Sequence, residues 1–187
     1  TVINVGSYPQ QSIFIDDNEM NLYDRVGKLL ASQRTYDGRF IYSSDLYIQP
    51  FSSEVFECIG GEVEEHAMES DPVLENSFLR VEVNSDGSVS VFDKQLQKEV
   101  TSGPGNCLYV YKDIPVAWDA WDIDHDYEIS GKRLTALDVR TIESGPVRKV
   151  VQAKYEYEGS SIVQRYILNA SSRRLDIEND IDWHTRR

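Results

Sequence analysis

The sequence predicts an all-β protein built from antiparallel sheets, and two observations carry that prediction. Apolar and polar residues alternate with a period of two in several stretches, whereas the 3.6-residue period of an amphipathic helix is almost absent. Asp-Gly pairs stand between strand-like stretches, where a hairpin turn needs a left-handed backbone. This combination is typical of strands with one buried and one solvated face.

The first part of the chain opens with a strand-like stretch, TVINVG at 1–6. Its best helical pattern lies at 21–32, where the apolar residues that share one face are Leu22, Val26, Leu29 and Leu30. Gly27 lies inside this pattern and disfavours a helix, so we predict a turn from Asp24 to Gly27. A second turn is predicted at Asp37-Gly38, between two strand-like runs.

A domain boundary is predicted near residue 70. The stretch GGEVEEHAMESDP at 60–72 is acidic and poor in apolar residues, which is typical of a linker or a long edge connection with solvated charges. We therefore expect a small β lobe over residues 1–70 and a second β domain over residues 71–187.

The second part contains several segments with the period of a strand. RVEVNSDGSVSVFD at 80–93 predicts a hairpin around Asp86-Gly87, and SGPGN at 102–106 predicts a tight turn before the strand CLYVY. Two further strands, 151–157 and 162–168, are joined by a turn at EGSS. In the last strand, Asn179 is the one polar residue in an apolar phase made of Leu175, Ile177, Ile181 and Trp183. We expect all these strands to be half-buried.

Charge and hydropathy exclude two classes of partner. The chain has 32 acidic against 19 basic residues and a formal charge of −13, so a phosphate backbone is repelled and nucleic acid is not an expected partner. No apolar run approaches the roughly 20 residues that span a bilayer, and no signal peptide opens the chain. We expect no membrane partner and a cytoplasmic location.

The two cysteines and the two chain ends give further expectations. Cys58 and Cys107 lie in apolar, strand-like surroundings with no metal-ligand partner at short spacing, so we expect both to be small buried residues. The chain opens on an apolar strand without an initiator methionine and closes on DIDWHTRR without a turn. We interpret it as a piece of a longer protein.

The stretch VAWDAWDIDHD at 116–126 is the most distinctive motif of the sequence. Its carboxylates offer a pair for acid and base catalysis of glycoside hydrolysis, or oxygen donors for a metal around His125. Its indoles favour stacking on the C–H faces of a sugar, with the acids accepting hydroxyl hydrogen bonds. In a purely structural role, Trp118 and Trp121 plug a sandwich core and the acids face water.

No other motif indicates a catalytic apparatus. Neither a GxSxG nor an HExxH, CxxC or Walker pattern occurs in the sequence. His184 has no acid, serine or cysteine partner of known proximity, and His66 lies in the acidic stretch. The roles of His125 and His184 stay open at this point.

From Val73 onward the sequence resembles the β-rich C-terminal region of α-mannosidases of glycoside hydrolase family 38, in its cytosolic and bacterial branch. The stretches that carry the resemblance are VLENSFLRVEVNSDGSVSVFDKQLQKEV, SGPGNCLYVYKDIPVAWDAWDID and IENDIDWHTRR. The middle stretch is the specific one. Residues 1–70, with VINVGSYPQQSIFID and YDGRFIYSSD, resemble more loosely the small sandwich that precedes this region.

The resemblance implies a fold and the place of the chemistry. It implies an incomplete antiparallel β-sandwich of the galactose-mutarotase-like type, preceded by a small β-sandwich lobe. Family members are retaining exo-α-mannosidases whose zinc ion and aspartate nucleophile lie in an N-terminal α/β barrel, which this sequence lacks. The resemblance therefore assigns no catalytic residue and no metal ligand to this chain. An incomplete sandwich leaves an unpaired edge, which adds a homo-oligomer to the expected partners.

These observations predict a noncatalytic sandwich that supports the N-terminal catalytic domain of an α-mannosidase and lines its sugar cleft. We expect Trp118 and Trp121 to anchor their loop by burial, worth roughly 1.5 to 3 kcal/mol each. The residues expected to contact α-mannosides or the catalytic domain are Trp118, Asp119, Trp121, Asp122, Asp124 and His125. The alternatives are an autonomous carbohydrate-binding module and, from the mutarotase-like fold alone, an epimerase of sugar anomers.

Overall fold

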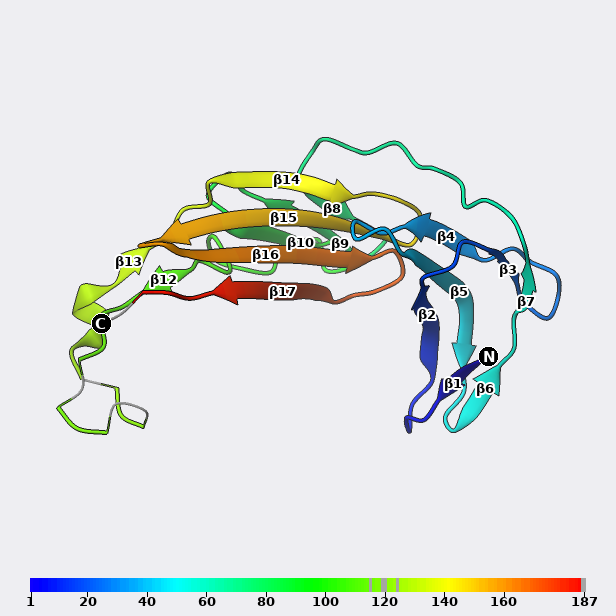
Figure 1. The fold of residues 1–187 in the computed structure, drawn as a ribbon, viewed down its shortest axis with the longest axis horizontal. Coiled ribbons are helices and arrows are strands. Elements are labelled where there is room, and N and C mark those ends of the chain that lie inside the picture. Colours follow the sequence, from blue (N-terminus) through cyan, green and yellow to red (C-terminus); the bar gives the residue numbers. More distant parts are fainter. Residues whose placement is uncertain (115, 119–120, 124, 186–187) are drawn as a thin grey trace. The chain divides into compact units, whose positions relative to one another are not determined.

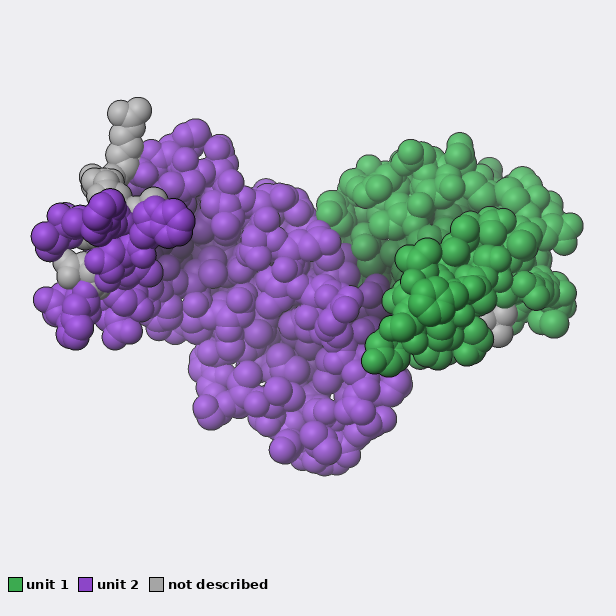
Figure 2. All heavy atoms as spheres, turned by 90° about the horizontal axis from the view of Figure 1, so that it is seen from below, with its two compact units in different colours: residues 1–69, 142–149 green, residues 70–141, 150–187 purple. Residues whose placement is uncertain are grey.

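The computed structural model describes residues 1–114, 116–118, 121–123 and 125–185. It forms two compact units, the first with residues 1–69 and 142–149, and the second with residues 70–141 and 150–187 (Figure 2). Strands dominate both units, and the helix among the described residues is a 3-10 turn, η1 (Tyr127–Ser130). The predicted all-β class is confirmed. No helix of the described residues is long and apolar enough to cross a lipid bilayer.

Short antiparallel strands build the first unit. Strands β2, β5 and β4 form a sheet in the order β2-β5-β4, and two smaller pairs, β1-β6 and β3-β7, complete the unit. The strand bounds are β1 (Val2–Asn4), β2 (Gln10–Asp16), β3 (Asn21–Tyr23), β4 (Ala31–Arg34), β5 (Phe40–Ile48), β6 (Ser52–Glu54) and β7 (Glu57–Ile59). Their core contains Leu22, Leu30, Tyr42 and Val63.

The ambiguous stretch at 21–32 forms strands and a turn, as predicted from Gly27. The amide of Gly27 donates to the carbonyl of Asp24 at 3.0 Å, and Gly27 has a φ of +81°. The Asp24 carboxylate accepts from the amides of Val26 and Lys28 at 3.0 and 2.8 Å. A short side chain that satisfies its own turn thus replaces the hydrogen bonds of a helix.

The acidic segment after β7 runs in extended form (Figure 1), and most of its residues are exposed. Val63 is 6% exposed and belongs to the core, and its amide donates to the Glu19 carboxylate at 2.8 Å. Farther along, the Glu69 carboxylate forms an ion pair with Lys149. The expectation of a merely solvated segment is wrong at these points, because one apolar residue among the acids is enough to hold it on the core.

A buried amide organises the polar interior of the first unit. The Gln33 side chain is 1% exposed, and its oxygen accepts from the amides of Val147 and Arg148 at 2.8 and 3.0 Å. Its nitrogen donates to the carboxylate of Glu143 at 2.7 Å and to the carbonyl of Arg148 at 3.0 Å. Glu143 is itself 2% exposed and pairs with the Arg148 guanidinium at 2.7 and 3.0 Å. Segment 142–149 is counted with the first unit, and these contacts bind it to β4.

Two antiparallel sheets face each other in the second unit (Figure 1). One has the order β11-β10-β9-β8 and the other β14-β15-β16-β17, with a small β12-β13 ladder at the end of the sandwich. The strand bounds are β8 (Val73–Glu75), β9 (Leu79–Val83), β10 (Val89–Asp93), β11 (Lys98–Glu99), β12 (Tyr109–Val110), β13 (Lys132–Arg133), β14 (Asp138–Glu143), β15 (Arg148–Tyr157), β16 (Ser160–Asn169) and β17 (Leu175–Asp182). The predicted antiparallel sandwich is confirmed.

The alternation in the sequence locates most of the sandwich core correctly. Strand β9 alternates buried Leu79, Val81 and Val83 with exposed residues, and β15 contributes buried side chains to the same core. The prediction is wrong for β17, where Ile181 is 61% exposed and Trp183, just beyond it, is 47% exposed. Strand β17 lies at a sheet edge and only Leu175 of it packs on the core, so its remaining apolar residues face solvent.

Two buried tyrosines meet the β9-β10 hairpin inside the sandwich. The Tyr166 hydroxyl donates to the carbonyl of Gly87 at 2.5 Å, and the Tyr155 hydroxyl donates to the side-chain oxygen of Gln164 at 3.2 Å. Burial raises the pKa of both phenols, which keeps them protonated as donors. Gly87 has a φ of +84°, and a Cβ there would lie 1.9 Å from the Tyr155 oxygen. Only glycine permits both the turn and this contact.

The hydrogen bonds of the buried Tyr166 and Gln164 explain two polar residues that interrupt apolar patterns. Asn106, at the end of the SGPGN stretch, donates to the Tyr166 oxygen at 2.8 Å and to Gln164 at 3.1 Å. Asn179, the polar residue in the apolar phase of the last strand, accepts from the Gln164 amide at 2.7 Å. Gln164 is 2% exposed and would otherwise leave a buried amide unsatisfied.

The predicted burial of the two cysteines is wrong. Cys58 is exposed and Cys107 is partly exposed, and both are free thiols. Cys58 lies on β7, a strand of three exposed residues that pairs only with β3. A strand that belongs to such a small ladder has no second layer to cover it, although its sequence is apolar.

We predict that Gly87→Ala destabilises the sandwich more than Gly159→Ala. Both glycines have positive φ in hairpin turns of the second unit, but nothing lies within 4 Å of a Cβ at Gly159. Gly159→Ala should therefore cost about 1–2 kcal/mol, and Gly87→Ala about 3 kcal/mol or more, because it also displaces Tyr155. Urea unfolding of both variants measures the difference. Equal losses would show that the contact with Tyr155 is unimportant.

We also predict that Arg148→Met lowers the free energy of unfolding of the first unit by about 3–5 kcal/mol, because it leaves the Glu143 carboxylate buried without its cation. Arg39→Met is the matched control. Arg39 pairs with Asp37 at 2.7 Å, but both side chains are at least 36% exposed, so its loss should change stability little. Similar effects of the two substitutions in urea unfolding would contradict the role of the buried pair.

Candidate functional site

The distinctive motif of the sequence lies in the loop 111–131, between β12 and β13. These strands pair antiparallel, with Tyr109 opposite Arg133 and Val110 opposite Lys132, so the two ends of the loop lie next to each other. The loop projects from the end of the sandwich (Figure 1).

Ser130 fixes the base of this loop. Its hydroxyl accepts from the amide of Lys112 at 2.7 Å and donates to the carbonyl of Tyr127 at 2.7 Å. These bonds hold the end of β12 against η1. The base is thus ordered by hydrogen bonds, although the sequence around it has no repeating pattern.

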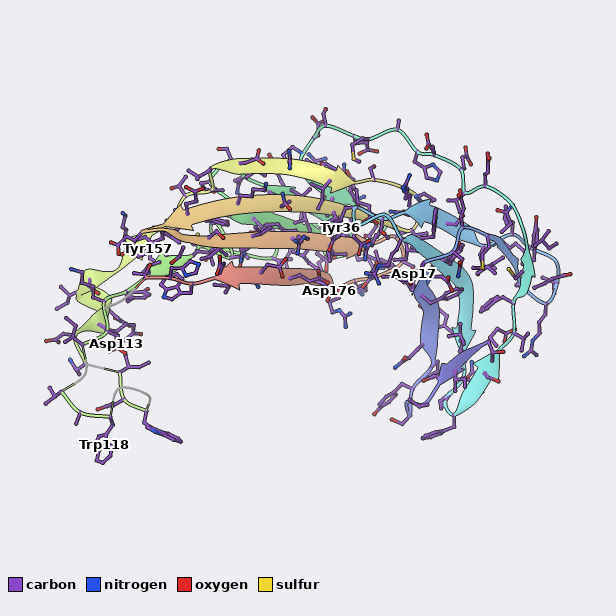
Figure 3. The ribbon with its side chains drawn as sticks, viewed as in Figure 1. Asp17, Tyr36, Asp113, Trp118, Tyr157 and Asp176 are labelled. Atoms are coloured by element: carbon purple, nitrogen blue, oxygen red, sulfur yellow. The ribbon has the colours of Figure 1, made fainter. Side chains whose placement is uncertain are left out.

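The predicted burial of the two loop tryptophans is wrong. Trp118 is 76% exposed and Trp121 is 90% exposed. Their backbones form a turn, because the amides of Trp121 and Asp122 both donate to the carbonyl of Trp118, at 2.7 and 3.1 Å. Figure 3 shows the Trp118 side chain at the tip of the loop, away from the strands. The loop is too far from the core for either indole to fill it.

The structure describes only some of the remaining residues of the motif. Asp119 and Asp124 lie outside the described residues. Asp122 is exposed, and so is His125, whose Nδ1 lies 3.0 Å from the carboxylate of its neighbour Asp126. Their contact with a ligand or with a catalytic domain stays a prediction.

Apolar side chains other than the indoles are also exposed on the loop. Val116 is 98% exposed, and large exposed fractions are found as well for Ile114, Ile123 and Ile129. Exposed apolar residues that gather in one segment, rather than singly, are typical of an interaction surface. Acidic neighbours accompany them at Asp122, Asp126 and Glu128.

A hollow of about 360 Å³ opens at the base of the loop, and we name it the aromatic hollow. Its walls are Tyr109, Tyr111, Asp113, Ile123, Tyr127 and Trp183, and its floor is formed by Leu108, Val110, Leu134 and Ile162. Sequence reasoning missed it, because its residues come from β12, the loop, β16 and the segments that adjoin β12, β13 and β17. The alternation of Tyr109 and Tyr111 in CLYVY was the available signal.

Aromatic rings around the hollow contact one another. Tyr109 and Tyr111 stack with 6.1 Å between ring centroids, and Tyr127 meets Tyr111 edge-on at 5.1 Å. Trp183 stacks on Tyr157 at 6.1 Å. The nearby charge of Glu128 raises the pKa of Tyr127, whose hydroxyl donates to the Glu128 carboxylate at 3.3 Å.

Two further hollows, of about 650 and 690 Å³, lie in the first unit. Both are lined by Glu62, Glu64 and His66, and the ring of His66 lies 3.4 Å from the carbonyl of Ser32. His184, in the second unit, pairs with Asp182 at 3.0 Å. Within the described part of the chain, no three His, Cys, Asp or Glu residues are grouped so that they could hold a metal ion.

Comparison with known proteins gives consistent results. The family described as "Glycosyl hydrolases family 38 C-terminal domain" matches residues 74–187. "Alpha-mannosidase G" of Dictyostelium discoideum is 30% identical over 133 residues, which cover 65% of this chain and 12% of that protein. The chain therefore spans a small part of this relative.

Two solved structures from Enterococcus faecalis share the fold. One is an alpha-mannosidase, with a TM-score of 0.68 and 15% identity over 96% of this chain and 29% of that chain. The other is a protein of glycosyl hydrolase family 38, with a TM-score of 0.66 and 14% identity over 96% of this chain and 30% of that chain.

We predict that the double substitution Trp118→Ala and Trp121→Ala leaves the thermal stability of the 187-residue chain unchanged within about 0.5 kcal/mol, because both indoles are exposed. Tyr8→Ala, at a residue that is 76% exposed in the first unit, is the control. Circular dichroism during heating measures the effect. A loss of several kcal/mol for the double variant alone would indicate that the indoles are buried after all.

Proposed function

We propose, since this chain belongs to the family of C-terminal domains of glycosyl hydrolase family 38, that it is the noncatalytic sandwich region of a retaining exo-α-mannosidase. The match of the family over residues 74–187 carries the proposal. The likeness to a named alpha-mannosidase supports the same enzyme class. In this role the chain supports a catalytic domain, which acts on α-mannosides and holds the zinc ion and the nucleophile.

The exposed loop gives this supporting role a physical basis. Two indoles and several aliphatic side chains that face water do not stabilise a monomeric domain. A partner surface that covers these side chains lowers the free energy, because it removes their apolar area from water. The catalytic domain of the same polypeptide is the partner that we propose. On this arrangement Trp118, Trp121 and the acids near them form an interface or one wall of the sugar cleft.

The acids of the loop and His125 are proposed to lie at the rim of this contact. Asp122 and His125 are exposed on the same loop as the indoles, where they can accept or donate hydrogen bonds at the rim of the contact. Asp119 and Asp124 are proposed for the same role from the sequence. We further propose a cytoplasmic location, for which the two free thiols are the supporting observation.

The first experiment is an activity assay of the 187-residue chain. With zinc added, the chain should release aryl alcohol from an aryl α-mannoside no faster than buffer does, because the proposed catalytic groups belong to another domain. Absorbance of the released phenolate measures the rate. A rate that rises in proportion to the concentration of pure protein would refute the noncatalytic assignment.

A second experiment tests the loop in a polypeptide that joins this chain to a family 38 catalytic domain. Here the substitutions Trp118→Ala and Trp121→Ala should lower the unfolding midpoint of the joined protein by at least about 2 °C, because they remove buried contact area. Tyr8→Ala again serves as the exposed control. If Trp118→Ala and Trp121→Ala leave the unfolding midpoint of the joined protein unchanged, the loop does not form the proposed interface.

A further inference from the structure

The aromatic hollow combines an apolar floor with half-exposed aromatic walls. Its floor contains Leu134 and Ile162, which belong to the sandwich core, so the hollow opens directly above well-packed residues. Tyr109, Tyr111 and Trp183 line the walls and keep 40% to 49% of their surfaces exposed. Rings that face a small concave space in this way remain available to a ligand.

The walls are held in place before any ligand arrives. Tyr111 lies between Tyr109, which stacks on it, and Tyr127, which meets it edge-on. Gly131 permits this position, because a Cβ there would lie 2.7 Å from the Tyr111 ring. Trp183 is braced by Tyr157, whose ring also faces the Lys132 ammonium, 5.4 Å from the ring centroid. Rings that are already ordered lose little conformational entropy on binding.

We propose that the aromatic hollow is a binding site for a neutral pyranoside. A volume of about 360 Å³ lies at the small end of the range of ligand pockets, which suits one or two sugar rings better than a peptide or a protein surface. Tyrosine and tryptophan present apolar faces to the C–H side of a sugar, while phenol hydroxyls and the Asp113 carboxylate bond its hydroxyl groups.

Charge decides which sugars fit. The chain carries a formal charge of −13, and Asp113 lies in the wall of the hollow, so an anionic sugar is disfavoured. The raised pKa of Tyr127 agrees with a neutral hydrogen-bonding wall. The site differs from the tryptophan loop tip and goes beyond the proposed function, because a sandwich can support a catalytic domain without binding sugar itself.

The test is an NMR titration of the 15N-labelled 187-residue chain with methyl α-D-mannopyranoside. The chain has three tryptophans, so its indole signals separate Trp183 in the hollow from Trp118 and Trp121 on the loop. We expect saturable shifts of the Trp183 indole and unmoved signals for the other two. Methyl β-D-glucuronide, which is anionic, should bind more weakly.

Variants assign the effect to the hollow. Tyr109→Ala should weaken binding about tenfold, and Tyr109→Phe, which keeps the ring, should weaken it less. Tyr8→Ala, at an exposed residue of the first unit, should leave the affinity unchanged within about twofold. A dispersed spectrum of each variant shows that it is folded.

Three results would overturn the proposal. The first is an absence of saturable shifts in the folded chain, and the second is an equal response of all three indoles. The third is a change of the Trp183 signal that depends on protein concentration and that the sugar does not reverse, because a second copy of the chain would then cover the hollow. None of these results bears on the activity assay or on the stability of the joined polypeptide, so the proposed function is judged separately.

Discussion

The packing of two antiparallel sheets around the hydroxyl groups of Tyr155 and Tyr166 determines how the second unit is built. Apolar faces alone would let the sheets slide, because burial is not directional. The hydrogen bonds of these phenols and of Gln164 reach the β9-β10 hairpin and Asn106. If one sheet shifted against the other, each broken hydrogen bond would leave a buried polar group unsatisfied. Gly87 permits the approach that makes this network possible.

The candidate functional surface depends on this sandwich. The β12-β13 ladder and Ser130 fix the base of loop 111–131, and core residues form the floor of the aromatic hollow beside it. A rigid sandwich thus presents two kinds of exposed apolar surface at one end, a projecting loop and a shallow concave site. Projecting side chains suit insertion into a partner, whereas a concave site suits a small ligand. The two proposals follow from this difference in shape.

Sequence alternation identified most strands, because a strand with one buried face must repeat every two residues. Glycine at Gly27 and Gly87 likewise identified turns. Contacts between distant residues could not be found in this way, such as Gln33 with Glu143 or Tyr109 with Trp183 in one hollow. The burial of Trp118, Trp121, Cys58 and strand β17 was mispredicted for a related reason, because an apolar residue type does not reveal whether its cover lies within this chain.

Loop 111–131 is, in our proposal, a docking surface on a noncatalytic sandwich. Hydrogen exchange tests it most directly, by comparing the amides of Val116, Trp118 and Trp121 in this chain with the same amides in a polypeptide that includes the catalytic domain. We predict that their exchange slows only in the joined polypeptide, while the core strands β15 and β16 exchange alike in both. Equal exchange of the loop amides in both proteins would contradict the account.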